Sequence, residues 1–183
     1  MGAEREDHQL LEALAARDLT ALSALYDRYG RMAYALAYRI LGEPEAAEDV
    51  VQDAFLSAWR GAGTFRRDRG NGRSWLLSIV HHRAVDVLRR KTTFRPAPLE
   101  AASAVPSDQD TAEEAVRGVE GGTVRAALSG LPEAQRRTLE LAYFGGYTQS
   151  ELAELMGVPL GTVKGRMRIG LQKMRRALEG ALR

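Results

Sequence analysis

The sequence contains no cysteine and no long apolar run, and each absence excludes a class of protein. Without cysteine, neither disulfides nor thiolate metal sites can form, as is usual for proteins of a reducing compartment. No apolar stretch approaches the roughly 20 residues that span a bilayer. The N-terminus is acidic and amphipathic, whereas a secretory signal begins with basic residues followed by an apolar core. We therefore expect a soluble, cytoplasmic protein that does not insert directly into a membrane.

Motifs for catalysis and metal binding are missing as well. The glycines of GAGTF, residues 61–65, lack the Lys-Ser/Thr pair and the preceding strand of a phosphate-binding loop. His81 and His82 would point about 100° apart on a helix, and no metal-binding His or Cys set accompanies them. No nucleophile elbow or catalytic triad is recognisable. The sequence thus predicts no enzyme activity, no metal site and no cofactor.

Strand patterns with a period of two are also lacking, so the sequence predicts an all-α fold. Its 183 residues suffice for one domain or two small ones. The formal net charge of +2 says little about partners, but the charges are distributed unevenly. Helices are expected over residues 6–16, 19–41, 45–61, 74–91, 111–128, 132–143, 149–156 and 160–182.

Residues 92–115 interrupt the helical patterns. They contain three of the six prolines and many small and polar residues, which is typical of a linker. Their charges are five acids against a single base, Arg95. We expect two small helical domains, residues 1–91 and 116–183, joined by this flexible acidic linker. Its acids are explained either by the solubility of a flexible segment or by occupation of a channel built for nucleic acid.

Residues 147–178 predict two helices joined by a very short turn. Thr148 and Glu151 form a T-x-x-E capping box, in which each side chain satisfies a backbone N–H of the first helical turn. Gly157 can adopt the positive φ that ends the first helix, and Pro159 suits the start of the second. The pattern predicts a helix-turn-helix, whose second helix reads DNA in the major groove.

The second helix of this motif has two different faces. Gly165 lets the backbone approach base edges, while Lys164 and Arg166 project toward the phosphates on either side. From the charges alone, a solvated basic face remains the alternative. The opposite face is expected to be an apolar stripe at helical spacing, formed by Val163, Met167, Leu171, Met174 and Leu178.

An acidic helix is expected near the middle of the first domain. Residues 43–53 hold five acids and no base, and Glu45, Asp49, Gln52 and Asp53 fall on its polar side. This side either binds a basic partner or is an ordinary solvated face. The apolar side of the helix is formed by Val50, Val51, Ala54, Phe55 and Ala58.

A loop rich in arginine and glycine, residues 66–73, precedes the next helix. Trp75 lies beside these arginines and could stack on an unpaired base, or it could pack between helices as large aromatics usually do. On a helical wheel the inward positions are Leu76, Leu77, Val80, Ala84, Val87 and Leu88. The outward positions are Trp75, Ile79, His82, Arg83, Asp86, Arg89 and Arg90.

Taken in order, these segments resemble the bacterial extracytoplasmic-function (ECF) sigma factors, over nearly the whole chain. The two domains correspond to the family's regions 2 and 4, and the lack of a substantial domain between them is typical of this minimal subgroup. The segments that carry the resemblance are LYDRYGRMAYALAYRILG, AEDVVQDAFLSAW, FRRDRG, SWLLSIVHHRAVDVLRRK and LPEAQRRTLELAYFGGYTQSELAELMGVPLGTVKGRMR.

The resemblance implies that the protein binds core RNA polymerase, directs it to promoter DNA and helps to open the duplex without catalysing phosphoryl transfer. It also implies an anti-sigma factor as a partner. The acidic helix resembles the segment that docks on the coiled-coil clamp of the largest polymerase subunit, which assigns polymerase binding to Asp49, Gln52 and Asp53. The acidic linker would thread the RNA exit path in place of nascent RNA.

The family captures a non-template base of the minus-10 element in a loop that aligns here with residues 66–73. Asn71 offers donors and acceptors to a base edge, and the loop arginines can hold phosphates. Trp75 is followed by Leu76, so the aromatic pair with which primary sigma factors wedge the duplex open is incomplete. Opening should therefore depend more on promoter sequence. The implied minus-10 residues are Arg67, Arg69, Asn71, Arg73, Trp75, Ile79, His82, Arg83, Asp86, Arg89 and Arg90.

The segment GTVKGR, residues 161–166, resembles the start of the family's recognition helix for the minus-35 element. Many members continue with an Arg-Ala or similar basic pair, where this chain has Ile169 and Gly170. Ile169 could touch a thymine methyl group. The implied minus-35 residues are Thr162, Lys164, Gly165, Arg166, Arg168 and Ile169.

Two other classes of protein remain open. A stand-alone helix-turn-helix regulator would bind an operator without polymerase, but it would leave the acidic helix and the arginine loop without a role. The third class is an interaction protein whose basic helices bind acidic partners. Co-purification with core polymerase, or its absence, distinguishes the three.

Overall fold

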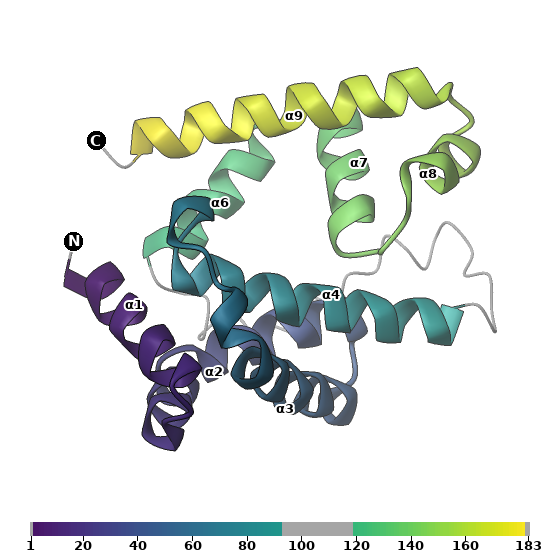
Figure 1. The fold of residues 1–183 in the computed structure, drawn as a ribbon. Coiled ribbons are helices and arrows are strands. Elements are labelled where there is room, and N and C mark those ends of the chain that lie inside the picture. Colours follow the sequence, from purple (N-terminus) through teal and green to yellow (C-terminus); the bar gives the residue numbers. More distant parts are fainter. Residues whose placement is uncertain (1, 93–118, 182–183) are drawn as a thin grey trace. The chain divides into compact units, whose positions relative to one another are not determined.

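The computed structural model describes residues 2–92 and 119–181, and the regular structure of these residues is helical throughout (Figure 1). The predicted all-α fold is thereby confirmed. The chain divides into two compact units, and the described part of the first unit ends at Val87, near the end of a long helix. The predicted linker after Thr92 and the beginning of the helix predicted from Thr111 lie outside the described residues. None of the described helices is long and apolar enough to cross a lipid bilayer.

The first unit is built from helices whose ends follow from local sequence. Asp18 precedes the second helix and accepts a hydrogen bond from the Thr20 backbone, and Gly42 ends it with a φ of 70°. Pro44 then stands in the first turn of the third helix, where its missing N–H leaves no helical bond unmade. The elements are α1 (Gly2–Ala15), α2 (Leu19–Leu41), α3 (Pro44–Gly61), the 3₁₀ turns η1 (Ala62–Thr64) and η2 (Arg67–Arg69), and α4 (Gly72–Thr92).

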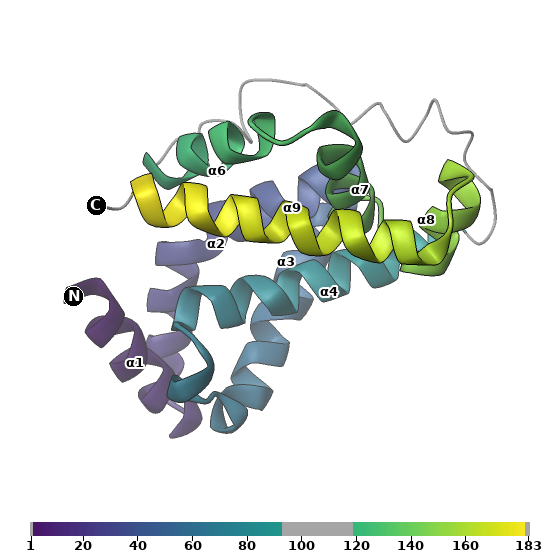
Figure 2. The ribbon, with the colours of Figure 1, turned by 90° about the horizontal axis from the view of Figure 1, so that it is seen from above.

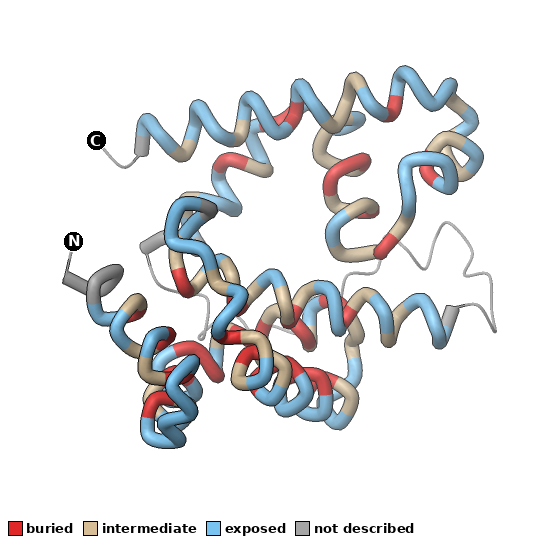
Figure 3. Tube along the Cα trace, viewed as in Figure 1, coloured by how far each residue is buried: buried red, intermediate tan, exposed pale blue. Residues whose placement is uncertain are grey.

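The core of the first unit lies where α2 packs along α3 and α1 covers α2 and η1 (Figure 3). Leu76, Val80 and Ala84 of α4 are buried, and Leu77 and Val87 are half-buried, as the helical wheel predicts; Leu88, which follows the first unit, is half-buried too. The apolar side predicted for α3 is confirmed in full. Its buried residues are Ala47, Val50, Val51, Ala54, Phe55 and Ala58.

The second unit consists of α6 (Val119–Ser129), α7 (Glu133–Tyr143), α8 (Gln149–Met156) and α9 (Leu160–Ala181). The long helix α9 packs against the other three (Figures 1 and 2). Its buried Val163 meets Leu141 of α7 and Leu152 of α8 in a small apolar core. This core fixes how α8 and α9 present their outer surfaces.

The predicted apolar stripe of α9 is wrong at Leu171, which is 54% exposed. Gly170 is buried in its place, and a Cβ atom added there would lie only 2.9 Å from Cδ1 of Leu139 on α7. The helix therefore turns Gly170 toward α7, and this close approach rotates Leu171 to the surface. Val163, Met167, Met174 and Leu178 remain buried or half-buried.

Candidate functional site

The helix-turn-helix of the second unit has the local structure that the sequence predicts. Thr148 Oγ1 accepts from the Glu151 backbone N–H at 3.2 Å, and Glu151 Oε2 accepts from the Thr148 N–H at 2.6 Å. Hydrogen bonding to the Thr148 backbone, and then to its side chain, lowers the pKa of Glu151. Gly157 ends α8 with a φ of 60°, and only three residues separate Met156, the last residue of α8, from Leu160, the first residue of α9. The motif is thus held at both its cap and its turn.

The exposed face of α9 carries the residues predicted for the minus-35 element. Thr162, Lys164 and Arg168 are exposed, and Arg166 is half-buried. Apart from the backbone of α9 and the two adjoining residues, no heavy atom of the described residues lies within 4 Å of the position that a Cβ atom of Gly165 would occupy, so the surface is open there as predicted. Ile169 is 39% exposed on this side of the helix. The face can therefore offer cations, a hydroxyl and an apolar side chain to a groove, although which group meets which base stays a prediction.

The loop before α4 presents fewer unpaired cations than its sequence suggests. Arg66 donates to both carboxylate oxygens of Asp68, at 3.1 and 3.0 Å, so one positive charge of the loop is paired within the loop. Arg67 is exposed, Arg73 is half-buried, and the side chain of Arg69 lies outside the described residues. Gly70 has a φ of 146°, a conformation that other residues rarely adopt. The backbone therefore makes a turn here that depends on glycine.

Asn71 has a structural role that the sequence analysis missed. Its side-chain oxygen accepts a hydrogen bond from the Ser74 N–H at 2.8 Å, and its backbone carbonyl accepts from the Trp75 N–H at 3.1 Å. Asn71 is thus the N-cap of α4, which begins at Gly72 and not at residue 74. The signal was available, because asparagine is among the preferred N-cap residues. Its amide N–H₂ group is the part left to meet a base.

Trp75 packs with one edge against the Phe65 ring, with ring centroids 5.6 Å apart, and stays half-buried. The packing interpretation and the base-stacking interpretation are therefore compatible. Further along the outward face of α4, Ile79 is half-buried, and Arg83 donates to Ser57 Oγ of α3 at 2.8 Å. The predicted residues of this face from position 82 onward are all exposed: His82, Arg83, Asp86, Arg89 and Arg90.

The predicted polymerase-binding residues Asp49, Gln52 and Asp53 are exposed on α3. Gln52 also lines an open hollow of about 430 Å³ between α2 and α3, which the sequence analysis missed. Tyr26 and Leu56 at this hollow are 50% and 48% exposed, an unusual position for large apolar side chains. The other lining residues are Leu19, Leu22, Ser23 and Phe55. Carboxylates thus lie on the same helix as an unfilled apolar surface.

Comparison with known proteins identifies both units. Residues 25–94 match the family profile of Sigma-70 region 2, and residues 127–176 match that of Sigma-70 region 4. The chain is 34% identical over 171 residues to an ECF RNA polymerase sigma factor SigK of Mycolicibacterium vanbaalenii, covering 92% of this chain and 87% of the relative. It is also 34% identical to the Mycobacterium tuberculosis protein of the same name, covering 93% of this chain and 92% of the relative.

Among solved structures, Rhodobacter sphaeroides SigE in complex with the anti-sigma ChrR is 29% identical to this chain. The match covers 94% of this chain and 98% of that protein, with a TM-score of 0.47. CnrH in complex with the cytosolic domain of CnrY is 27% identical, and the match covers 95% of this chain and 97% of that protein, with a TM-score of 0.42.

Proposed function

The chain belongs to the ECF group of RNA polymerase sigma factors, and from this premise we propose which of its surfaces perform each step of initiation. As a sigma factor it directs core RNA polymerase to specific promoters and aids DNA opening. It acts as a regulatory subunit and leaves phosphoryl transfer to the polymerase. Residues 1–91 form the domain for polymerase binding and minus-10 recognition, and residues 116–183 form the domain for minus-35 recognition.

The observation that carries the proposal is that the first unit has two surfaces of opposite charge. One is the acidic side of α3, and the other is the arginine loop with the outward face of α4. On α3, Gln52 lines the apolar hollow, and the exposed acids Asp49 and Asp53 lie on the same helix. A basic coiled-coil helix of core polymerase fits such a surface, because its cations pair with the acids while its apolar side chains fill the hollow. Charge complementarity guides the encounter, and apolar burial supplies most of the binding free energy.

The arginine loop and the outward face of α4 capture the unpaired non-template strand. Flipping a base out of the stack costs a few kcal/mol, so opening requires new partners for that base and its backbone. Arg67 is exposed for a phosphate, and the amide N–H₂ of Asn71 is suited to a base edge with a hydrogen-bond acceptor. Trp75 offers the free part of its ring for stacking.

The α9 face reads the minus-35 element, with Gly165 allowing close approach and Lys164 and Arg166 contacting the strands on either side. The protein acts in the cytoplasm, where its polymerase works. An anti-sigma factor is a further partner, because regulators of this type are expected for the family. The linker occupies the RNA exit path.

Transcription of genomic DNA in vitro tests the proposal. Core polymerase with this protein should produce transcripts that start at defined sites, and sequencing them gives the promoter elements. Core polymerase with the Asp49→Arg and Asp53→Arg variant should lose these transcripts. A stand-alone regulator would instead bind DNA fragments without polymerase and add no start sites, and that result would overturn the proposal.

A further inference from the structure

Helix α1 precedes the segment that matches Sigma-70 region 2, yet it contacts the arginine loop at both of its ends. At the end that joins α4, Gly72 is buried against α1. A Cβ atom added to Gly72 would lie 2.8 Å from Leu11 Cδ1 and 3.3 Å from Asp7 Cβ. Leu11 is itself buried, so it has little room to move. The loop can meet α1 this closely because residue 72 has no side chain.

At the other end of the loop, aromatic rings connect α1 to α4. The His8 ring lies 5.7 Å from the Phe65 ring, and Phe65 lies 5.6 Å from Trp75. Both ring nitrogens of His8 are buried without a hydrogen-bond partner among the described residues. His8 therefore contributes here as a flat packing surface behind Phe65. Phe65, which packs against Trp75, is therefore itself supported by His8 of α1.

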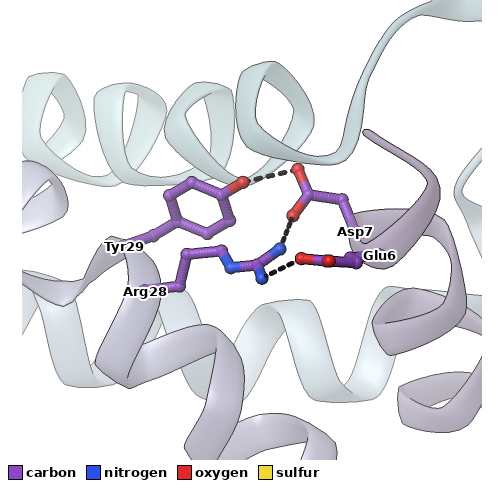
Figure 4. Close-up of polar contacts among 4 residues, drawn as sticks. All are labelled: Glu6, Asp7, Arg28 and Tyr29. Carbon is purple, nitrogen blue, oxygen red and sulfur yellow. Dashed lines mark hydrogen bonds and ion pairs between the residues drawn. The ribbon is translucent and has the colours of Figure 1, made fainter. Parts of the chain in front are cut away.

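Helix α1 is anchored to α2 by a buried carboxylate (Figure 4). Asp7 accepts from Arg28 Nη1 at 2.7 Å and from the Tyr29 hydroxyl, and its side chain is only 5% exposed. Arg28 also donates to Glu6 at 2.7 Å. The hydrogen bonds that Arg28 donates to Asp7 and Glu6 raise the pKa of Arg28, while burial, followed by the bond to Asp7, raises the pKa of Tyr29 to about 12. At neutral pH both donors are protonated, so the anchor is intact.

We propose that α1 is a positioning element for promoter opening: Leu11 and Asp7 against Gly72, and His8 behind Phe65, hold the arginine loop in the geometry that captures the minus-10 base. This inference rests on the role proposed above for the loop. The loop contains the short 3₁₀ turn η2, followed by Gly70 with its positive φ. A loop of this kind costs ordering entropy when it binds, unless neighbouring elements order it beforehand.

Substitutions at His8 test the aromatic contact. His8→Ala removes the ring behind Phe65, whereas His8→Phe keeps a ring and removes only the unpartnered nitrogens. Gln9→Ala, at the exposed neighbouring position, is the control. We expect His8→Ala holoenzyme to open a duplex promoter roughly 2- to 30-fold more slowly, the range typical of changes in packed coupling networks. His8→Phe and Gln9→Ala should open it at the wild-type rate.

The contact at Gly72 is tested by a double-substitution cycle. Gly72→Ala should slow opening because the added methyl group collides with Leu11, and the same change in a Leu11→Ala background should slow it much less. Circular dichroism and core-polymerase affinity are measured for every variant. A positioning role predicts that both stay unchanged while opening slows and the preference for the captured base relaxes.

Each outcome decides between specific claims. If His8→Ala and Gly72→Ala open the promoter at the wild-type rate, or if core binding and opening fall in parallel, the positioning role is wrong. If Gly72→Ala has the same effect with either residue at position 11, the contact with Leu11 is not the cause. Arg67→Ala is run beside them: a normal opening rate for that variant would overturn the proposed function of the loop itself.

Discussion

At the scale of single residues, small side chains and capping groups decide what the surfaces can present. Gly165 leaves the α9 face open between Lys164 and Arg166, and Gly170 lets α9 lie close to α7. Asn71 fixes the start of α4 with its oxygen and keeps its amide N–H₂ group for other contacts. These residues act through the backbone, by permitting a close approach or by fixing a helix end.

Alanine at Lys164 or Arg166 should weaken promoter binding. If the replaced residue reads a base, the substitution should cost about 1–3 kcal/mol of binding free energy and relax the preference at one position. If it contacts a phosphate, the substitution should weaken binding to all sequences alike and flatten the salt dependence. Binding of holoenzyme to promoters with each minus-35 base replaced, at several salt concentrations, separates the two roles. Lys173→Ala on the same helix is the control, and a footprint indifferent to both substitutions would show that the assigned face of α9 is wrong.

The capping box makes the stability of α8 depend on pH. The folded pKa of Glu151 lies below its usual value of 4.5, so its contribution is complete above pH 4.5 and is lost as the pH falls through the folded pKa. Thr148→Ala should lower the free energy of unfolding by about 0.5–2 kcal/mol at neutral pH. The difference between wild type and Glu151→Gln should shrink in acid.

Urea titrations followed by circular dichroism measure both effects in the full chain. Trp59 and Trp75 both lie in the first unit, so tryptophan fluorescence reports that unit separately and serves as the internal control. A pH-independent difference between wild type and Glu151→Gln would contradict a charged role for this side chain.

Some residues could not be placed from sequence. Asp7 looks like one more acid of an acidic N-terminus, and only its spacing from Leu11 and Leu14 hints that it shares the buried face of α1. On a helical wheel Leu171 fits the apolar stripe as well as Gly170 does, because the wheel contains no information on how closely α7 approaches α9. In both cases the deciding contact comes from another helix.

At the scale of elements, helix ends with strong local signals were predicted well. The predicted bounds of α2 and α8 agree with the structure, because Asp18, Gly42, Thr148 and Gly157 each cap by local hydrogen bonds or a positive φ. Weak signals misplaced other ends: α1 begins at Gly2, four residues before its prediction, and α4 begins two residues early at Gly72. The hollow between α2 and α3 depends on how two helices pack, which no single segment encodes.

The α3 surface should be needed for core binding. Replacing Asp49 and Asp53 by arginine places like charges against a basic partner, which costs several kcal/mol. Affinity for core polymerase, measured by fluorescence anisotropy of the labelled protein, should fall while helical content stays unchanged. Glu12→Arg with Glu133→Arg applies the same change in net charge at exposed sites elsewhere. Equal affinity for both double variants would remove the assigned role of α3.

At the scale of the whole molecule, the chain has two compact units, to which we assign two separable tasks. The first unit holds the proposed docking surface and the arginine loop, and the second holds the capped helix-turn-helix. The resemblance to a family identified both units, while the roles of individual residues depend on the bound partners and remain predictions. The central claim is that finding the promoter and opening it reside in different units.

Permanganate reactivity of minus-10 thymines tests that claim most directly, with holoenzyme carrying Arg67→Ala, Arg69→Ala and Asn71→Ser. Serine retains the capping oxygen for α4 but removes the amide donors, so the helix start should survive. Arg31→Ala with Arg60→Ala removes the same charge at other exposed positions. We predict that the loop variant still protects the minus-35 element but leaves duplex thymines unreactive. Transcription should recover on a template with a pre-melted minus-10 bubble, because the unpairing cost of a few kcal/mol is largely removed there. Normal thymine reactivity on duplex DNA, or no recovery on the bubble, would contradict the account.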